Sequence, residues 1–178
     1  DVDADGARVA EQFAEEAVRL GLHVTSGAAR GVDQVAMNAA HRAEGSVVGI
    51  LADSLQQRVR SAEVMAALDA GTTCLISQQH PGAGFSTGAA MGRNKLIYAL
   101  SAVTVVVASD LETGGTWAGA TEAMHHRYGR VAVWRGEGEG PGNARLADLG
   151  AKPLRKIGDL QSALVAEDPE PVQMSLIE

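Results

Sequence analysis

Three glycine-containing segments hold the residues whose types suit the binding of an anion. They are Ser26-Gly27-Ala28-Ala29-Arg30-Gly31-Val32-Asp33, the stretch 82–95, and Glu112-Thr113-Gly114-Gly115-Thr116. Small residues allow a phosphate to approach backbone N–H groups, and the start of a following helix favours negative charge. These residue types therefore predict phosphate binding. No residue is predicted to be catalytic, and no metal or cofactor is expected.

The first segment predicts a phosphate-binding turn between a strand and a helix. Ser26, Gly27 and Gly31 give the turn its small size, and Arg30 supplies a guanidinium that can clamp a phosphate. Asp33 falls in the first turn of the expected helix, where it would cap the backbone. The alternative interpretation is a plain tight turn with no ligand.

The second segment is rich in glycine but is not a P-loop, because no Gly-Lys-Ser/Thr follows the glycines. Arg93, Asn94 and Lys95 are expected at the start of a helix over 94–101. Basic side chains there oppose the helix dipole, so an anionic ligand is expected to account for them. Phe85 is a candidate for stacking on a base. The alternative is an exposed loop with incidental charges.

The third segment again places glycines between a strand and a helix. Gly114 and Gly115 are expected in the turn, and Thr116 is expected either to cap the helix or to bind phosphate. This segment supports the prediction mainly by its position, because it again places a glycine turn between a strand and a helix, as the first segment does.

The elements that must position these segments alternate along the chain. Strands are expected at 22–25, 46–52, 73–77, 103–108, 130–134 and 152–156, and helices at 6–20, 33–43, 54–70, 94–101, 116–128, 144–149 and 158–166. The strands are continuous apolar runs, which is typical of a parallel sheet covered on both faces. We therefore expect an α/β, Rossmann-like, doubly wound fold with a mainly parallel sheet. Ligands bind at the carboxyl ends of such strands, where the three segments would meet.

Composition limits the function classes. The 178 residues carry a net charge of −7, which as a whole disfavours nucleic acid, yet residues 17–157 hold 14 basic and 11 acidic side chains. One cysteine excludes an intrachain disulfide and a Cys-based zinc site. Aromatic residues make up 3%, too few for a broad base-stacking platform. The apolar runs are too short to cross a bilayer, so no membrane contact is expected.

The segments 26–33, 93–101 and 103–108 with its glycine turn resemble the DNA-processing protein A (DprA/Smf) family, and Gly142-Asn143 also fits it. The resemblance covers about 6–155, within a domain assigned to 1–157, and leaves 158–178 as a helix and polar tail. It implies a cytoplasmic, non-enzymatic protein of the nucleotide-binding SLOG superfamily. Such a protein would form a homodimer, bind single-stranded DNA and load RecA. It also implies phosphate contacts by Arg30, Arg93 and Lys95 and a pocket shaped by Gly27, Gly31, Gly114 and Gly115. With the residues argued from the segments themselves, the predicted binding residues are Ser26, Gly27, Arg30, Gly31, Phe85, Arg93, Asn94, Lys95, Gly114, Gly115 and Thr116.

Departures from the family pattern leave two other functions open. The family core opens with one more strand, which residues 1–178 do not supply, and Met37 replaces a usual His. The third segment drifts toward the related LOG phosphoribohydrolases, but Glu122 does not have the spacing of their signature. The alternatives are a sensor of a nucleotide or nucleotide-derived molecule, favoured by the overall acidity, and a LOG-like phosphoribohydrolase.

The C-terminal tail resembles a short docking peptide. Residues Gln173-Met174-Ser175-Leu176-Ile177 are similar to the Gln-x-Ser-Leu-Phe peptide that binds the DNA polymerase sliding clamp. Two apolar anchors on a polar linker suit such docking. The alternative is an end of the chain with no partner.

Overall fold

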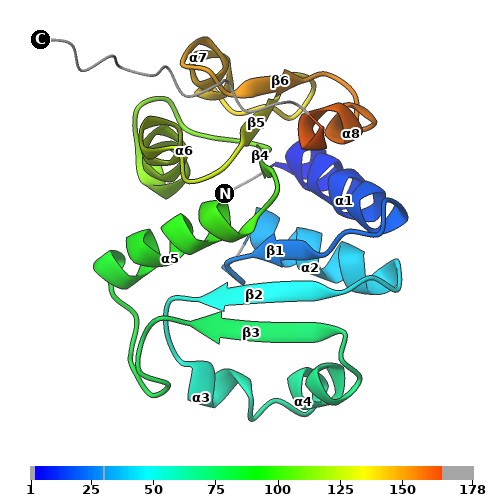
Figure 1. Cartoon of the computed structure of the whole chain (residues 1–178), viewed down its shortest axis with the longest axis vertical. Helices are drawn as coiled ribbons and strands as arrows, with labels where there is room; N and C mark the ends of the chain where they lie inside the picture. Colours follow the sequence, from blue (N-terminus) through cyan, green and yellow to red (C-terminus); the bar gives the residue numbers. More distant parts are fainter. Residues whose placement is uncertain (1–2, 30, 166–178) are drawn as a thin grey trace, which may run out of the picture.

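The computed structural model describes residues 3–29 and 31–165, and the expected α/β fold is confirmed. All paired strands are parallel (Figure 1). They form two sheets of three rather than one. The first is β1 (Val24–Ser26), β2 (Val47–Leu51) and β3 (Thr73–Ser77), and the second is β4 (Thr104–Val106), β5 (Val131–Trp134) and β6 (Lys152–Leu154).

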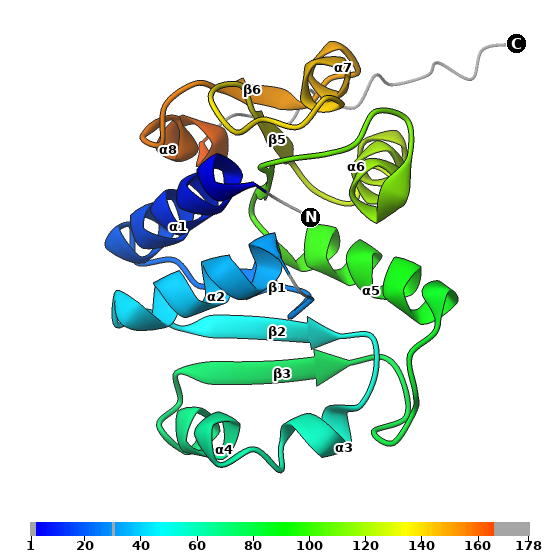
Figure 2. The same ribbon diagram turned by 180° about the vertical axis from the view of Figure 1, so that it is seen from behind.

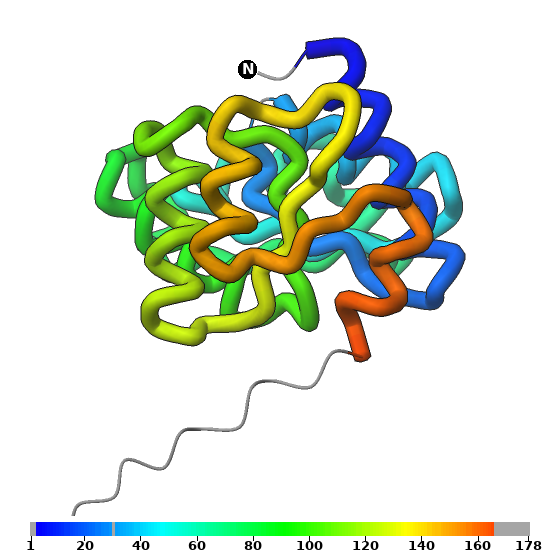
Figure 3. The backbone as a smooth tube through the Cα atoms, turned by 90° about the horizontal axis from the view of Figure 1, so that it is seen from above, coloured from blue at the N-terminus to red at the C-terminus, as the bar shows by residue number. Residues whose placement is uncertain are grey.

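Helices cover the sheets from both sides. Helix α2 lies behind β1 in Figure 1 and in front of it in the reverse view of Figure 2. Seen from above, α1 and α6 lie on opposite sides of the molecule (Figure 3). The helices are α1 (Ala4–Arg19), α2 (Val32–Arg42), α3 (Leu55–Arg58), α4 (Ala62–Asp69), α5 (Thr87–Leu100), α6 (Gly114–His126), α7 (Asn143–Asp148) and α8 (Asp159–Leu164).

The second sheet carries most of the core. On one face, Phe13 of α1 packs edge-on against Trp134, with ring centroids 5.7 Å apart. On the other, Tyr98 of α5 belongs to a cluster with Val133 and Leu146. Burial of these side chains fixes α1, α5 and α7 around β4–β6, since apolar burial is the main favourable term in folding.

The two sheets face each other across an apolar groove. In the described chain, β1 and β4 are both edge strands and no hydrogen bonds join them. The groove between them has a volume of about 420 Å³, and its walls include Val24, Val103, Val105 and Phe13. Unpaired edges that face each other across apolar side chains are the arrangement that an intervening strand would satisfy.

The helix predicted over 54–70 is wrong, because the chain breaks it in two. Ser54 adopts a left-handed backbone conformation (φ 51°) and its side chain makes no capping hydrogen bond. Ser61 is extended and starts the second helix, α4. Neither α3 nor α4 contains a buried residue, so this pair covers β3 loosely.

The predicted start of the helix at 94 is also wrong, since α5 begins at Thr87. The Ser86 hydroxyl oxygen accepts a hydrogen bond from the backbone N–H of Ala89 at 3.1 Å, which caps the helix. Gly92 lies inside the helix, where a Cβ would overlap the Gln78 amide. Residues 93–95 are consequently in the middle of α5, and the argument from the helix dipole does not apply to them.

Smaller differences affect the third segment. Helix α6 begins at Gly114, so both glycines expected in the turn are its first residues. Thr113 holds the N-cap position, so Thr116 does not cap the helix. The strand expected over 103–108 is limited to Thr104–Val106. No helix in the described ranges is long and apolar enough to span a bilayer.

Candidate functional site

A cleft of about 440 Å³ lies beside the carboxyl ends of β1 and β4. The first turns of three helices contribute to its walls: Gly31 and Asp33 from α2, Thr87 from α5, and Gly115 and Thr116 from α6. Backbone N–H groups in a first helical turn lack intrahelical partners and carry partial positive charge. The cleft is therefore suited to an anion, and it occupies the position where doubly wound folds bind ligands.

Arg93 forms the floor of this cleft and holds the first segment in place. Its side chain is only 10% exposed, and Nη1 donates hydrogen bonds to the carbonyl oxygens of Gly27 and, at 3.4 Å, Ile50. The same nitrogen lies 3.8 Å from a carboxylate oxygen of Asp33. A Cβ at position 27 would overlap the guanidinium, so glycine is required there by close approach. The buried Nε has no partner among the described residues.

The turn of the first segment depends on two further contacts. The Asp33 carboxylate accepts a hydrogen bond from the backbone N–H of Ala29 at 3.2 Å, so it closes the loop and does not cap α2. Gly31 holds the N-cap position with φ 90°, a conformation that side chains disfavour. Ser26 is buried and lines the groove between the sheets. Arg30 lies outside the described residues.

Asn94 joins the second and third segments, whereas Lys95 points elsewhere. The Asn94 amide donates to the carbonyl oxygen of Gly115 at 3.4 Å and lines the cleft. Lys95 is not among the lining residues, and its Nζ lies 2.8 Å from a carboxylate oxygen of Glu122 on α6. The hydrogen bond with Glu122 raises the pKa of Lys95. Glu122 is therefore engaged away from the cleft.

Two other predicted residues lie outside the cleft. Phe85 is 68% exposed and precedes the start of α5, whose residue Thr87 lines the cleft wall. Gly114 lines a neighbouring hollow of about 270 Å³, together with the carboxyl-bearing residues Asp3, Asp110 and Glu139. The negative charges of these acidic residues disfavour the binding of an anion in this neighbouring hollow. Of the predicted residues, the structure brings Gly31, Arg93, Asn94, Gly115 and Thr116 together.

Asn143 holds the backbone of the loops next to the site in place, a role that was not predicted from the sequence. It is fully buried, and its Oδ1 accepts a hydrogen bond from the Ser109 N–H at 2.9 Å. Its Nδ2 donates to the carbonyl oxygens of Val107 at 2.7 Å and Trp134 at 2.9 Å. The amide thereby ties the end of β4 to the end of β5 and fixes the loop that leads to α6. The Gly-Asn pair was the available sequence signal.

Tyr98 is the second residue that the sequence did not single out. It lines the cleft from α5 and is buried. Burial, followed by the negative charge of Asp33, raises the pKa of its phenol far above the ordinary value. The phenol is therefore protonated throughout the physiological range. Among the described residues, no group of three His, Cys, Asp or Glu side chains could hold a metal ion.

Solved structures with the same fold come from two groups of proteins. DNA processing protein A from Streptococcus pneumoniae superposes with a TM-score of 0.74 at 21% identity, covering 90% of this chain and 57% of that one. The Helicobacter pylori protein, described for its single-stranded DNA binding mode, gives 0.70 at 21% identity, covering 89% and 73%. The molybdenum cofactor binding protein from Rippkaea orientalis gives 0.65 at 17% identity, covering 91% and 87%.

The family comparison agrees with the resemblance read from the sequence. No curated protein sequence matches the chain. The model of the family described as DNA recombination-mediator protein A matches residues 1–165, which is nearly the whole chain. The fold is accordingly Rossmann-like, and the chain belongs to the DNA recombination-mediator protein A family.

Proposed function

We propose that the chain binds single-stranded DNA and assists recombination, with a backbone phosphate in the cleft between β1 and β4. The observation that carries this proposal is the meeting of three helix first turns, from α2, α5 and α6, around one cleft. Family membership and the DNA-binding description of the Helicobacter pylori neighbour support nucleic acid as the source of the phosphate.

The site residues take different roles in this proposal. Backbone N–H groups at Gly31 and Gly115, with the Thr116 hydroxyl, contact the phosphate. Arg93 acts as a positioning residue, because its Nη1 is already bonded to backbone oxygens and its carboxylate neighbour balances its charge. Lys95, which is 46% exposed, contacts a flanking phosphate by exchanging its partner Glu122.

Two further residues extend the contact beyond the cleft. Arg30, adjacent to Gly31 in sequence, clamps a neighbouring phosphate as the family resemblance implies. Phe85 stacks on a base near the start of α5, which its 68% exposure permits. Both roles add affinity without sequence preference, because they address the phosphate backbone and the flat face of any base.

We propose that the groove between β1 and β4 accommodates the additional strand that the family pattern implies. Such a strand would run parallel to both edges, and its carboxyl end would reach the cleft beside Ser26. Asp3, at the start of α1, borders the hollow formed by 108–110 and the first turn of α6, which lies at the same edge. In this proposal helix α1 follows that strand and returns to β1 by the right-handed crossover that parallel strands favour.

The wider partners follow from the family alone. The proposal includes RecA as a recipient of the DNA, a homodimer as the working form, and action in the cytoplasm. Docking on the sliding clamp would use residues 173–177, which lie outside the described residues. Removing 173–178 should abolish clamp pull-down, and retained capture would refute the tail's role.

Fluorescence anisotropy of a labelled single-stranded oligonucleotide, measured at several salt concentrations, tests the DNA proposal. Affinity should fall steeply with salt, because binding several phosphates releases counterions. Thr116→Val should weaken binding to unrelated sequences alike, about three- to tenfold, since it removes one hydrogen bond to phosphate. Thr121→Val is the matched control, because that hydroxyl bonds only to carbonyl oxygens within α6. Unaltered affinity of the Thr116 variant would refute the assigned cleft.

A nucleotide sensor is the second candidate, supported by the net charge of −7 and a cleft volume of about 440 Å³, which suits a small ligand. Binding of one nucleotide in a cleft should depend on salt less than binding along a strand. A thermal shift with a nucleotide but no oligonucleotide binding at low salt would favour it. The phosphoribohydrolase alternative has little support, because Asp33, the one carboxylate lining the described cleft, is engaged by Ala29 and Arg93.

A further inference from the structure

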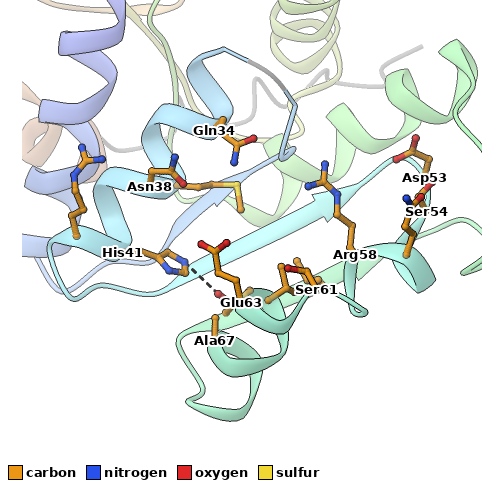
Figure 4. A pocket seen from close by; sticks show the side chains of 15 residues that line it. Gln34, Asn38, His41, Asp53, Ser54, Arg58, Ser61, Glu63 and Ala67 are labelled. Carbon is orange, nitrogen blue, oxygen red and sulfur yellow. Dashed lines mark hydrogen bonds between the residues drawn. The ribbon is translucent and has the colours of Figure 1, made fainter.

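A second, larger cavity lies between α2 and the α3–α4 pair, on one face of β2 and β3. Its volume is about 880 Å³. Figure 4 shows Gln34, Asn38 and His41 of α2 along one wall and Arg58, Ser61 and Glu63 along the other. We call this cavity the α2–α4 groove. It is separate from the candidate phosphate cleft, and none of the predicted binding residues that the structure describes lines it.

The groove exists because the helix expected over 54–70 is broken. With no buried residue in α3 or α4, this pair does not pack closely against the sheet, and Met65 of α4 is 41% exposed. On the opposite wall, Gln34, Met37, Asn38 and His41 follow the spacing that places residues on one face of a helix. The groove is therefore formed by a continuous stripe of α2 and an open layer opposite it.

Three carboxamides in the wall have unused hydrogen-bonding capacity. The side chains of Gln34, Asn38 and Gln57 line the groove and make no side-chain hydrogen bond within residues 3–29 and 31–165. Each carries an N–H₂ donor beside a carbonyl acceptor. The edge of a nucleobase presents the complementary pattern of acceptors and donors, and carboxamides read it in two-point contacts.

The charges of the groove point to a neutral group. The described lining holds two arginines, Arg42 and Arg58, and two carboxylates, Asp53 and Glu63, so its formal net charge is zero when His41 is neutral. A lining without net charge gives a phosphate little electrostatic attraction, whereas a neutral base does not depend on such attraction. Apolar side chains of Met37 and Leu75 also belong to the lining and offer a surface for the face of a ring.

Arg58 connects the groove to the first segment. Its Nη2 lies 3.4 Å from the carbonyl oxygen of Ala28, so a side chain of the groove wall contacts the turn whose residues Ala29 and Gly31 line the phosphate cleft. We propose that the α2–α4 groove binds a nucleobase of the single strand whose phosphate occupies the cleft. This proposal rests on the proposed function, and it assigns the groove the base-contacting part of the interface.

The test compares an oligonucleotide with the same strand made abasic, for the wild-type chain and for Gln34→Ala/Asn38→Ala. The double variant should bind the base-bearing strand about tenfold more weakly, from the loss of two hydrogen bonds, and the abasic strand as tightly as the wild type does. Gln12→Ala, an exposed glutamine on α1 outside the groove, is the matched control. Circular dichroism establishes that the variants are folded. An equal loss on both strands, or no loss on either, overturns the proposal.

A second measurement separates this proposal from the DNA function. If the wild-type chain binds neither strand, the proposed function fails, and the groove is then examined with free deoxyadenosine and thymidine by ligand-observed NMR. Nucleoside binding that disappears in the double variant supports a base site in the groove. Absence of nucleoside binding to the wild-type chain overturns it.

Discussion

The guanidinium of Arg93 donates a hydrogen bond to the carbonyl oxygen of Gly27, although 66 residues separate them in sequence. The contact joins the middle of α5 to the turn after β1, and it requires that position 27 carry no side chain. Two residues expected to bind phosphate independently are therefore parts of one structural unit. The contact between Arg93 and Gly27 therefore helps to set the shape of the phosphate cleft.

Gly27→Ala should lower the free energy of unfolding by about 1–3 kcal/mol, because the new methyl group overlaps the Arg93 guanidinium. Arg93→Ala removes that overlap, so the same glycine substitution should cost much less in an Arg93→Ala background. Urea unfolding of the wild type, both single variants and the double variant measures the coupling. Additive losses would show that the two residues do not act together.

Asn143→Ala should lower the free energy of unfolding by about 2–4 kcal/mol. The substitution deprives the Ser109 N–H and the Val107 and Trp134 carbonyls of their buried partner. Asn38→Ala, at an exposed position without side-chain hydrogen bonds to the described chain, serves as the comparison and should cost much less. A loss for Asn143→Ala below about 0.5 kcal/mol would contradict the assigned role.

Glu122→Gln should raise the affinity for single-stranded DNA at low salt. The substitution removes the charge that holds Lys95, so the ammonium group becomes available to a phosphate. Lys95→Ala should reduce the slope of log affinity against log salt by about one. Anisotropy titrations across a range of salt concentrations measure both. A slope unchanged by Lys95→Ala would confine that side chain to its pairing with Glu122.

Stability should decline above about pH 10 because of Tyr98. Burial raises the pKa of this phenol in the folded chain, so folding favours the protonated form. Its contribution is fully present below the pKa of the unfolded phenol and is lost as the pH rises above that value. Urea unfolding at pH 8 and pH 11 should show a smaller alkaline loss for Tyr98→Phe than for the wild type. Equal losses would mean that another group causes the decline.

The parallel α/β architecture was predictable because continuous apolar strands alternate with helices at regular spacing. The strand at 73–77 agrees with the structure in both bounds. The start of α5 was not predictable from glycine content, because a single capping contact from Ser86 outweighs the low helix propensity of Gly88 and Gly92. The break at 59–61 was hidden for a related reason: the local sequence suits a helix, and the extended backbone of Ser61 ends one helix and starts the next.

Part of the candidate site could also be inferred from the sequence, since parallel strands bring the loops that follow them to one edge. The different roles of Arg93 and Lys95 could not be inferred from the sequence. Arg93 and Lys95 differ by two positions on α5, so they face different directions, one toward Gly27 and the other toward Glu122. Spacing alone treats them as one basic pair. The burial of Arg93 and the ion pair of Lys95 are tertiary contacts, which the local pattern does not encode.

The walls of the phosphate cleft have a mechanical consequence. Helix α2 packs on the first sheet and α6 on the second, and in the described chain no ladder hydrogen bonds join these sheets. An anion held by both helix starts is therefore a cross-link between two halves of the molecule. Occupancy of the cleft should slow amide hydrogen exchange in β1 and β4 together. Each tenfold rise in free ligand concentration above its Kd should add about 1.4 kcal/mol to the free energy of separating the two halves.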